Sequence, residues 1–231
     1  MLPATVALQR QFFSTSISRP TTVLLFSDQS KYQKHTALRQ ATGDHANSIY
    51  GYYEPGAQTA VVNLAAGEGT VVHELIHAMV MADFPDAPTW LNEGLASLFE
   101  HSRLVEQHGE PTLIPLHNWR LRVLQRGIAD GQQIPLRDLM VAPNVHRQNN
   151  ALFYSHARYF CFYLYELGQL EEFYSGYRNN NESRQELPDS ILPDLDWSSW
   201  DHDFRKWVTN QRLPKTTDGD DSAAIHRLLR E

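Results

Sequence analysis

Two histidines and a glutamate lie close together in an apolar stretch of the sequence. The stretch reads TVVHELIHAMV, from Thr70 to Val80, and contains His73, Glu74 and His77. On a helix, residues four apart face the same way, so both imidazoles can bind one ion, with Glu74 about 100° around the helix beside them. This HExxH pattern indicates a zinc site with a carboxylate able to accept a proton from water.

The same stretch has a second interpretation, as a buried helix that carries two histidines without function. Apart from the three polar residues and Thr70, every residue is apolar, which is typical of a buried helix. Burying three polar side chains without partners costs several kcal/mol. One metal ion would satisfy all three, whereas a structural role needs a separate partner for each. We therefore favour the metal site.

Glu93 is the candidate for a third ligand. Pro85 and Pro88 interrupt the helix, and Thr89 can cap a second helix. If the two helices run antiparallel, Glu93 returns to the level of the histidines, because each lies roughly 8 Å from the turn. Glu100, further along the second helix, could accept a hydrogen bond from a ligand histidine, or could be a solvated carboxylate.

The two helices resemble those of the gluzincin metallopeptidases. HELIH, followed after fifteen residues by the glutamate of WLNEGLASLFE, is similar to the family's motif, most closely in the peptidase-MA-like group related to the aminopeptidase-type gluzincins. YSHARYFCFYLYELG resembles the helix that supplies a catalytic tyrosine in these enzymes, and the matching residue is Tyr154, although His156 and Ala157 replace the usual Lys and Gly. GYYEPGAQTAVVN resembles the edge strand that precedes the metal helix.

The resemblance implies a thermolysin-like zincin catalytic domain of the α+β class. It would have a small mixed α/β N-terminal lobe with an edge strand, a mainly helical C-terminal lobe, and an active-site cleft between them. His73, His77 and Glu93 would hold one Zn²⁺ per chain, and zinc can lower the pKa of water from about 15.7 towards 7. Glu74 would accept the proton as water attacks a peptide carbonyl, and Tyr154 would stabilise the oxyanion.

The expected function is zinc-dependent peptide-bond hydrolysis, with a peptide or protein as substrate. The alternative is a zinc-retaining, peptidase-like binding module without turnover. Four residues are candidates for substrate binding: Gly51, Tyr52 and Tyr53 in the edge strand, to which an extended peptide could add a strand, and His156, which could line the cleft or be structural. The aminopeptidase signature G-x-M-E-N is missing, so an aminopeptidase is not expected.

Composition narrows the classes of partner. The net charge of -7 argues against nucleic acid, whose phosphates are bound by clustered Lys and Arg. No apolar run approaches the ~20 residues of a membrane-spanning helix, so we expect a soluble protein. Cys161 is the single cysteine, which excludes an internal disulfide and a thiolate-rich zinc site. This composition favours the cytoplasm, with an exported protein that has lost its signal as the alternative.

Hydrophobic patterning predicts an α/β part followed by a helical part. The first part contains a strand over 21–26, a helix capped near Asp28 or Ser30, and a hairpin around Glu54-Pro55-Gly56. Helical patterns then cover 70–82, 90–107, 118–129, 150–167 and 200–211, with Gly109, Gly131 and Gly168 as stops.

The 231 residues suffice for one domain of ordinary size or for two lobes that share a cleft. We expect residues 1–20 to be an extension outside the fold, either disordered or not native. Residues 21–213 would form one peptidase-like domain, with lobes over 21–89 and 90–213. The polar, proline-containing stretch 175–194 suits a surface loop, and residues 214–231 suit a flexible tail.

Overall fold

The computed structural model describes residues 2–41, 48–67, 69–141, 150–179 and 196–214. The chain is of mixed α and β structure, and it divides into two compact units. Unit 1 contains Met1–Ala87 and Leu95–Ile114, and unit 2 contains Pro88–Gly94 and Pro115–Glu231. The predicted division at residue 89 lies close to the first boundary, but the chain returns to unit 1 for residues 95–114.

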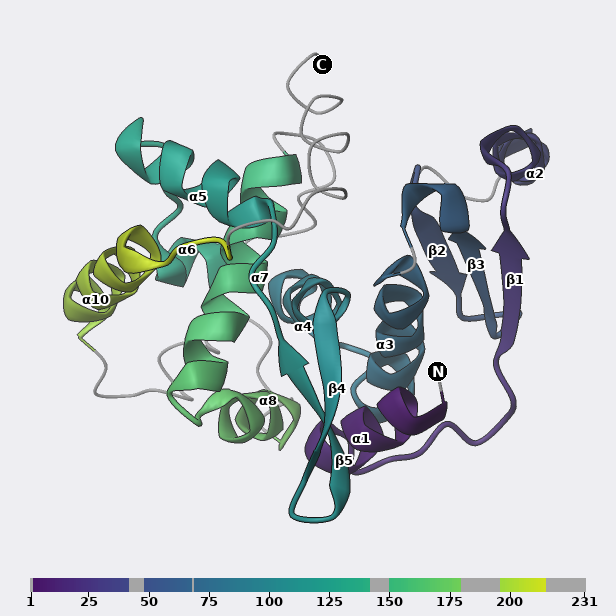
Figure 1. Cartoon of the computed structure of the whole chain (residues 1–231), viewed down its shortest axis with the longest axis horizontal. Helices are drawn as coiled ribbons and strands as arrows, with labels where there is room; N and C mark the ends of the chain where they lie inside the picture. The colour runs from purple at the N-terminus through teal and green to yellow at the C-terminus, as the bar shows by residue number, and fades with distance from the viewer. Residues whose placement is uncertain (1, 42–47, 68, 142–149, 180–195, 215–231) are drawn as a thin grey trace. The chain divides into compact units, whose positions relative to one another are not determined.

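Unit 1 contains a three-stranded sheet with the order β1-β3-β2 (Figure 1). The strands are β1 (Thr22–Phe26), β2 (Gly51–Glu54) and β3 (Thr59–Asn63). Strand β1 runs parallel to β3, whereas β2 runs antiparallel to it with Gly51 opposite Val62. The predicted strand and the predicted hairpin are therefore both confirmed, and β2 is an edge strand of this sheet.

Two helices pack on this sheet: α2 (Gln29–Ala41) contacts β1 and β3, and α3 (Gly69–Asp83) contacts β2 and β3. Because side chains alternate along a strand, Gly51 and Glu54 of β2 point to opposite faces. Gly51 lies against α3, and Glu54 forms an ion pair with Arg39 of α2. The two helices therefore cover opposite faces of the sheet.

The N-terminal residues form a helix, α1 (Leu2–Phe12), that packs on α3. The Phe12 ring lies 5.4 Å from the ring of Phe99, centroid to centroid. The expectation of an extension outside the fold is therefore wrong. It was based on the basic, Ser- and Thr-rich composition of this stretch, and it overlooked four apolar side chains that are buried, namely Ala7, Leu8, Phe12 and Phe13.

A β-hairpin follows α4 (Thr89–Phe99), where the sequence pattern predicted that the helix continues to residue 107. Its strands are β4 (Ser102–Gln107) and β5 (Glu110–Pro115). His108 and Gly109 form the turn with φ values of 53° and 81°, the left-handed conformation that two-residue hairpin loops require. Gly109 is thus a hairpin residue and not a helix stop.

Unit 2 is helical and is built around α7 (Asn150–Glu166). Helices α5 (Arg120–Ala129), α6 (Leu136–Val141), α8 (Leu170–Asn179) and α10 (Trp197–Asn210) pack on it. Helices α5, α7 and α10 were predicted, whereas the short α6 and the helix α8 were not. The remainder of the predicted loop beyond Asn179, to residue 194, and the predicted tail from 215 lie outside the described residues.

Aromatic rings on α7, α8 and α10 fill the interior of unit 2. The ring of Phe160 makes edge-to-face contacts with those of Phe173, Trp200 and Phe204.

Gly131 and Gly168 follow α5 and α7 with φ values of 70° and 68°, so both act as the predicted helix stops. None of the described helices is long and apolar enough to cross a membrane.

The burial of α1 predicts that Phe12→Ala lowers the free energy of unfolding by about 3 kcal/mol, because it leaves a cavity against Phe99. Val6→Ala, on the same helix at a side chain that is 39% exposed, serves as the matched control and should cost less than about 1 kcal/mol. Urea denaturation measures both. Equal stabilities of the two variants would contradict the placement of α1 in the core.

Candidate metal centre

The structure brings His73, His77 and Glu93 together. The two histidines lie one turn apart on α3, with ring centroids 4.7 Å apart and ring planes at 83°. Glu93 comes from α4, and the ligand atoms of the three residues all lie within 4.8 Å of one another. All three side chains are half-buried. Each of the three residues could therefore offer one donor atom to a single ion.

A short turn joins α3 to α4. The backbone N–H of Phe84 donates to Val80 at 2.7 Å, so α3 extends to the turn, and Pro88 opens α4 by accepting from Leu91 at 3.0 Å. Asp83, the last residue of α3, accepts hydrogen bonds from Ser14 and from the backbone of Thr15. The predicted interruption by the two prolines is thus confirmed. Hydrogen bonds from Ser14 and Thr15 also hold the end of α3 against the segment that follows α1.

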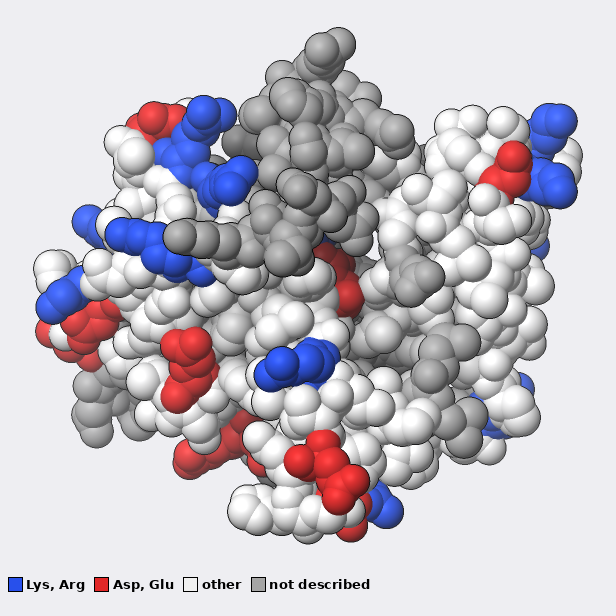
Figure 2. All heavy atoms as spheres, viewed as in Figure 1, with Lys and Arg blue, Asp and Glu red and all other residues white. Residues whose placement is uncertain are grey.

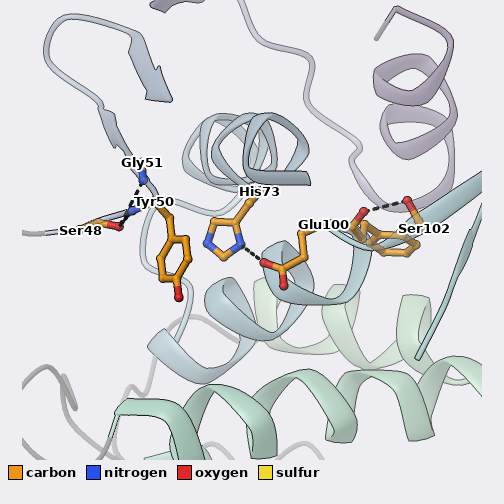
Figure 3. Close-up of polar contacts among 7 residues, drawn as sticks. Ser48, Tyr50, Gly51, His73, Glu100 and Ser102 are labelled. Carbon is orange, nitrogen blue, oxygen red and sulfur yellow. Dashed lines mark hydrogen bonds and ion pairs between the residues drawn. The ribbon is translucent and has the colours of Figure 1, made fainter. Parts of the chain in front are cut away.

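Glu100 contacts His73 directly, with Oε2 3.0 Å from Nδ1 (Figure 3). A carboxylate only accepts hydrogen bonds, so Nδ1 is the donor and Nε2 keeps the lone pair that a metal needs. The two side chains are only 14% and 17% exposed. Of the two interpretations of Glu100, the hydrogen bond to a ligand histidine is therefore the one that the geometry supports.

Gly69 explains how Glu100 reaches His73. Gly69 is the first residue of α3, and a Cβ placed on it would collide with the carbonyl oxygen of Glu100. The backbones of the two segments can meet here only because Gly69 has no side chain. His73 lies one helical turn further along α3, so this contact sets Glu100 at the level of its imidazole.

Glu74 is almost fully buried, with 3% of its surface exposed, and β2 lies directly against it. A Cβ on Gly51 would lie 2.9 Å from Oε1 of Glu74, 2.9 Å from Cγ2 of Thr70 and 2.8 Å from the carbonyl oxygen of Val61. These distances are shorter than normal van der Waals contacts. Gly51 therefore has a packing role that the sequence did not reveal: it leaves room for the Glu74 carboxylate.

The other two candidates on the edge strand, Tyr52 and Tyr53, are half-buried. Because Gly51 faces α3, Tyr52 faces the side of the sheet that α2 covers. Burial raises the pKa of Tyr53, and the nearby charge of Arg19 partly offsets this. Their contact with a substrate stays a prediction.

The stretch of sequence that carries the candidate centre contains no lysine or arginine. No Lys or Arg occurs between Arg39 and Arg103, a stretch that includes Glu74, Glu93 and Glu100. In Figure 2 the blue side chains at the far end of unit 1 lie over α2, while the surface over β2 and β3 is white. This stretch therefore brings carboxylates and imidazoles to the candidate centre, which are groups that can bind a cation, and no cationic side chain of its own.

Both ring nitrogens of His156 bond to the backbone. It is 1% exposed, its Nδ1 donates to the carbonyl oxygen of Leu152 at 3.1 Å, and its Nε2 accepts the N–H of Ile134 at 3.2 Å. Burial lowers the pKa of His156 to about 4, against the opposing effect of the Leu152 hydrogen bond, so the ring is neutral. The expectation of a substrate contact is corrected: both ring nitrogens are used to join α7 to the segment before α6.

Tyr154 lies in the second turn of α7, within unit 2, where its ring contacts that of Phe153 edge-on at 6.0 Å. Its role as a hydrogen-bond donor to an oxyanion stays a prediction.

Cys161, in the middle of the same helix, is fully buried, and burial raises the pKa of its thiol. This agrees with a packing role for the single cysteine.

The residues present fit a metal ion. Two imidazole nitrogens and one carboxylate oxygen form a donor set typical of catalytic zinc, which keeps a fourth position open. Imidazole also suits iron, copper and nickel, so this donor set could bind several divalent transition metals, zinc among them.

No model of a known protein family matches the chain, and no curated protein matches it either. The resemblance to the gluzincins therefore rests on the motifs themselves, HELIH, WLNEGLASLFE and the helix that contains Tyr154. The independent observation is geometric: residues that the motifs select from two helices lie within 4.8 Å of one another.

Two residues near the centre were missed in the sequence. Gly69 could have been found as a glycine at the start of the metal helix, where a close backbone contact is one common reason for glycine. Tyr50 precedes Gly51, and Figure 3 shows its phenol ring on the side of His73 opposite Glu100. It was not considered because it precedes the motif GYYEPGAQTAVVN, which begins at Gly51.

The hydrogen bond to His73 predicts that Glu100→Ala weakens zinc binding by about 10- to 100-fold, because the ligand imidazole loses the partner that orients it. Glu106→Ala, which removes an exposed carboxylate from β4, is the matched control. Competition with a chromophoric chelator measures both dissociation constants. If Glu100→Ala and Glu106→Ala both bind zinc with the same affinity as the parent, the role of Glu100 is refuted.

The contact at Gly51 predicts that Gly51→Ala destabilises the protein by about 1 to 3 kcal/mol, since the added methyl group has no room beside Glu74 and β3. Gly56→Ala adds the same methyl group in the hairpin turn, where nothing lies within 4 Å, and should change stability little. Thermal unfolding of both variants gives the comparison. A stable Gly51→Ala variant would show that β2 can move away from α3.

Proposed function

We propose that the protein is a zinc-dependent peptidase of the gluzincin type, with a thermolysin-like zincin domain. The observation that carries the proposal is the group His73, His77 and Glu93, whose ligand atoms lie within 4.8 Å of one another beside a buried glutamate. His73, His77 and Glu93 would hold the ion. Zinc in such a site supplies Lewis acidity, lowering the pKa of water from about 15.7 towards 7 and polarising a carbonyl group.

Glu74 would act as the general base. It follows His73 directly on α3, and Gly51 and Thr70 limit the positions that its carboxylate can take. A general base works only within hydrogen-bonding distance of the proton that it removes, so a restricted carboxylate next to a metal ligand suits this role. After the attack on the peptide carbonyl, Glu74 can pass the proton on to the leaving amine.

Two further groups would act on the substrate. Tyr154 would donate a hydrogen bond to the oxygen that becomes negative, as its counterpart does in the family that the chain resembles. An extended peptide would pair with the edge strand β2 by backbone hydrogen bonds, which supports a peptide or protein as the substrate.

The proposal predicts that substitution of His77 removes the metal, whereas substitution of Glu74, on the same helix, removes only the activity. His77→Ala should lose the metal, because two protein ligands bind zinc much more weakly than three. Glu74→Gln should retain one zinc per chain and cleave peptides on the order of 10²-fold more slowly or worse, because an amide cannot accept the proton. Glu172→Gln, at an exposed position of α8, is the control for the loss of one carboxylate.

Elemental analysis and a diverse peptide library, read by mass spectrometry, measure metal and cleavage together. A Glu74→Gln variant as active as the parent would refute the mechanism. A parent protein that holds one zinc per chain and cleaves no peptide in the library would instead support the alternative of a zinc-retaining binding module. A parent without metal would refute both.

A further inference from the structure

The segment immediately before β2 is bent and held by hydrogen bonds. The side-chain oxygen of Ser48 accepts the backbone N–H groups of Tyr50 and Gly51, both at 3.2 Å. Such a bond from a serine to the backbone two and three residues later forms a local turn. The hydroxyl of Tyr32 donates to the carbonyl oxygen of Ser48 at 2.6 Å, which ties this turn to α2.

Asn63, at the end of β3, holds the same segment from the other strand. Its side-chain nitrogen donates to the carbonyl oxygen of Ile49 at 2.8 Å. Its backbone N–H donates to the carbonyl oxygen of Tyr50 at 2.9 Å. Asn63 is fully buried, so these bonds are shielded from water. Both backbone polar groups of Tyr50 are therefore occupied, and the direction in which its side chain leaves the backbone is set.

This fixed segment lies on the metal helix. The neighbouring residue Gly51 touches Thr70 and Glu74 of α3, so the Tyr50 side chain starts beside the same helical turn. Figure 3 shows its ring on the Nε2 side of His73, with Glu100 on the Nδ1 side. Because Nδ1 is bonded to Glu100, Nε2 is the nitrogen that would face the metal. The phenol ring of Tyr50 thus lies on the side of the imidazole where Nε2 could bind a metal ion.

We propose that Tyr50 is a further catalytic residue, whose hydroxyl donates a hydrogen bond to a negatively charged oxygen of a ligand held at the His73, His77 and Glu93 centre. This inference rests on the proposed function. Tyr50 is half-buried, so part of its side chain remains exposed to solvent, from which a ligand would enter. Phenols are protonated at neutral pH, and hydrogen bonds to charged oxygens are about twice as strong as neutral ones.

Tyr50 differs from Tyr154 in one respect that matters for the test. Tyr50, His73, His77 and Glu74 all belong to unit 1, so the position of its hydroxyl relative to the ligand histidines is set within that unit. Its contribution should therefore appear with small ligands that bind the metal alone, and does not require an extended substrate. Acetohydroxamate is such a ligand, because it chelates zinc through oxygens that carry negative charge.

The experiment compares the zinc-loaded parent with Tyr50→Phe and with Tyr163→Phe, which removes a phenol oxygen from α7 among the aromatic side chains of α10. We expect Tyr50→Phe to bind zinc as the parent does, because Tyr50 is not a ligand, and to bind acetohydroxamate about 10- to 100-fold more weakly in calorimetry. Its kcat for a cleaved peptide should fall by a similar factor, with KM changed less than about threefold. Tyr163→Phe should match the parent.

The outcomes separate this inference from the proposed function. Equal acetohydroxamate affinity in the parent and Tyr50→Phe overturns the role of Tyr50, whatever the peptide assay shows. Loss of zinc in Tyr50→Phe also overturns it, because Tyr50 would then act on the metal itself. A parent that binds zinc and acetohydroxamate but cleaves no peptide overturns the peptidase proposal alone, while weaker hydroxamate binding by Tyr50→Phe still supports the inference. A parent that binds no zinc overturns both.

Discussion

The candidate metal centre depends on how closely the first turn of α3 lies against the residue that follows α4. Gly69 has no side chain, so the backbone of Glu100 can approach it, and the Glu100 carboxylate then meets Nδ1 of His73 one turn further along. That hydrogen bond leaves Nε2 of His73 with its lone pair. The orientation of His73 thus depends on a backbone contact between the start of α3 and the residue after α4, outside the HExxH pentapeptide itself.

A second glycine contact fixes the other side chain on which the chemistry would depend. Gly51 brings β2 so close to α3 that the Glu74 carboxylate is enclosed by strand and helix. Besides Ser48, the bonds that hold the segment before β2 come from Tyr32 and Asn63, a buried tyrosine and a buried asparagine outside the HExxH pentapeptide. Helix α3 is therefore positioned by the close contacts at Gly51 and Gly69 and by the hydrogen bonds that hold the segment before β2. The apolar side chains of α3 are the part of the helix that is buried in the core.

Three errors of sequence interpretation have physical causes. The N-terminal residues were judged by composition, but Ala7, Leu8, Phe12 and Phe13 are buried, with Phe12 against Phe99, and this burial stabilises a helix. The helix predicted to continue to residue 107 ends at Phe99, and the hairpin after it depends on the positive φ values of His108 and Gly109. His156 was placed near a ligand by its spacing from Tyr154, whereas burial and two backbone partners decided its role.

The sequence by itself determined the elements that carry the centre: the apolar helix with His73, Glu74 and His77, the interruption by Pro85 and Pro88, the hairpin, and Glu93 on the next helix. These follow from local periodicity and from backbone chemistry, which act within a few residues. Only the tertiary structure decided that Glu100 bonds to His73, that Gly51 and Gly69 are contact points, and that the Tyr50 ring lies on the Nε2 side of His73. Those facts depend on distances between segments up to about thirty residues apart, which no local pattern encodes.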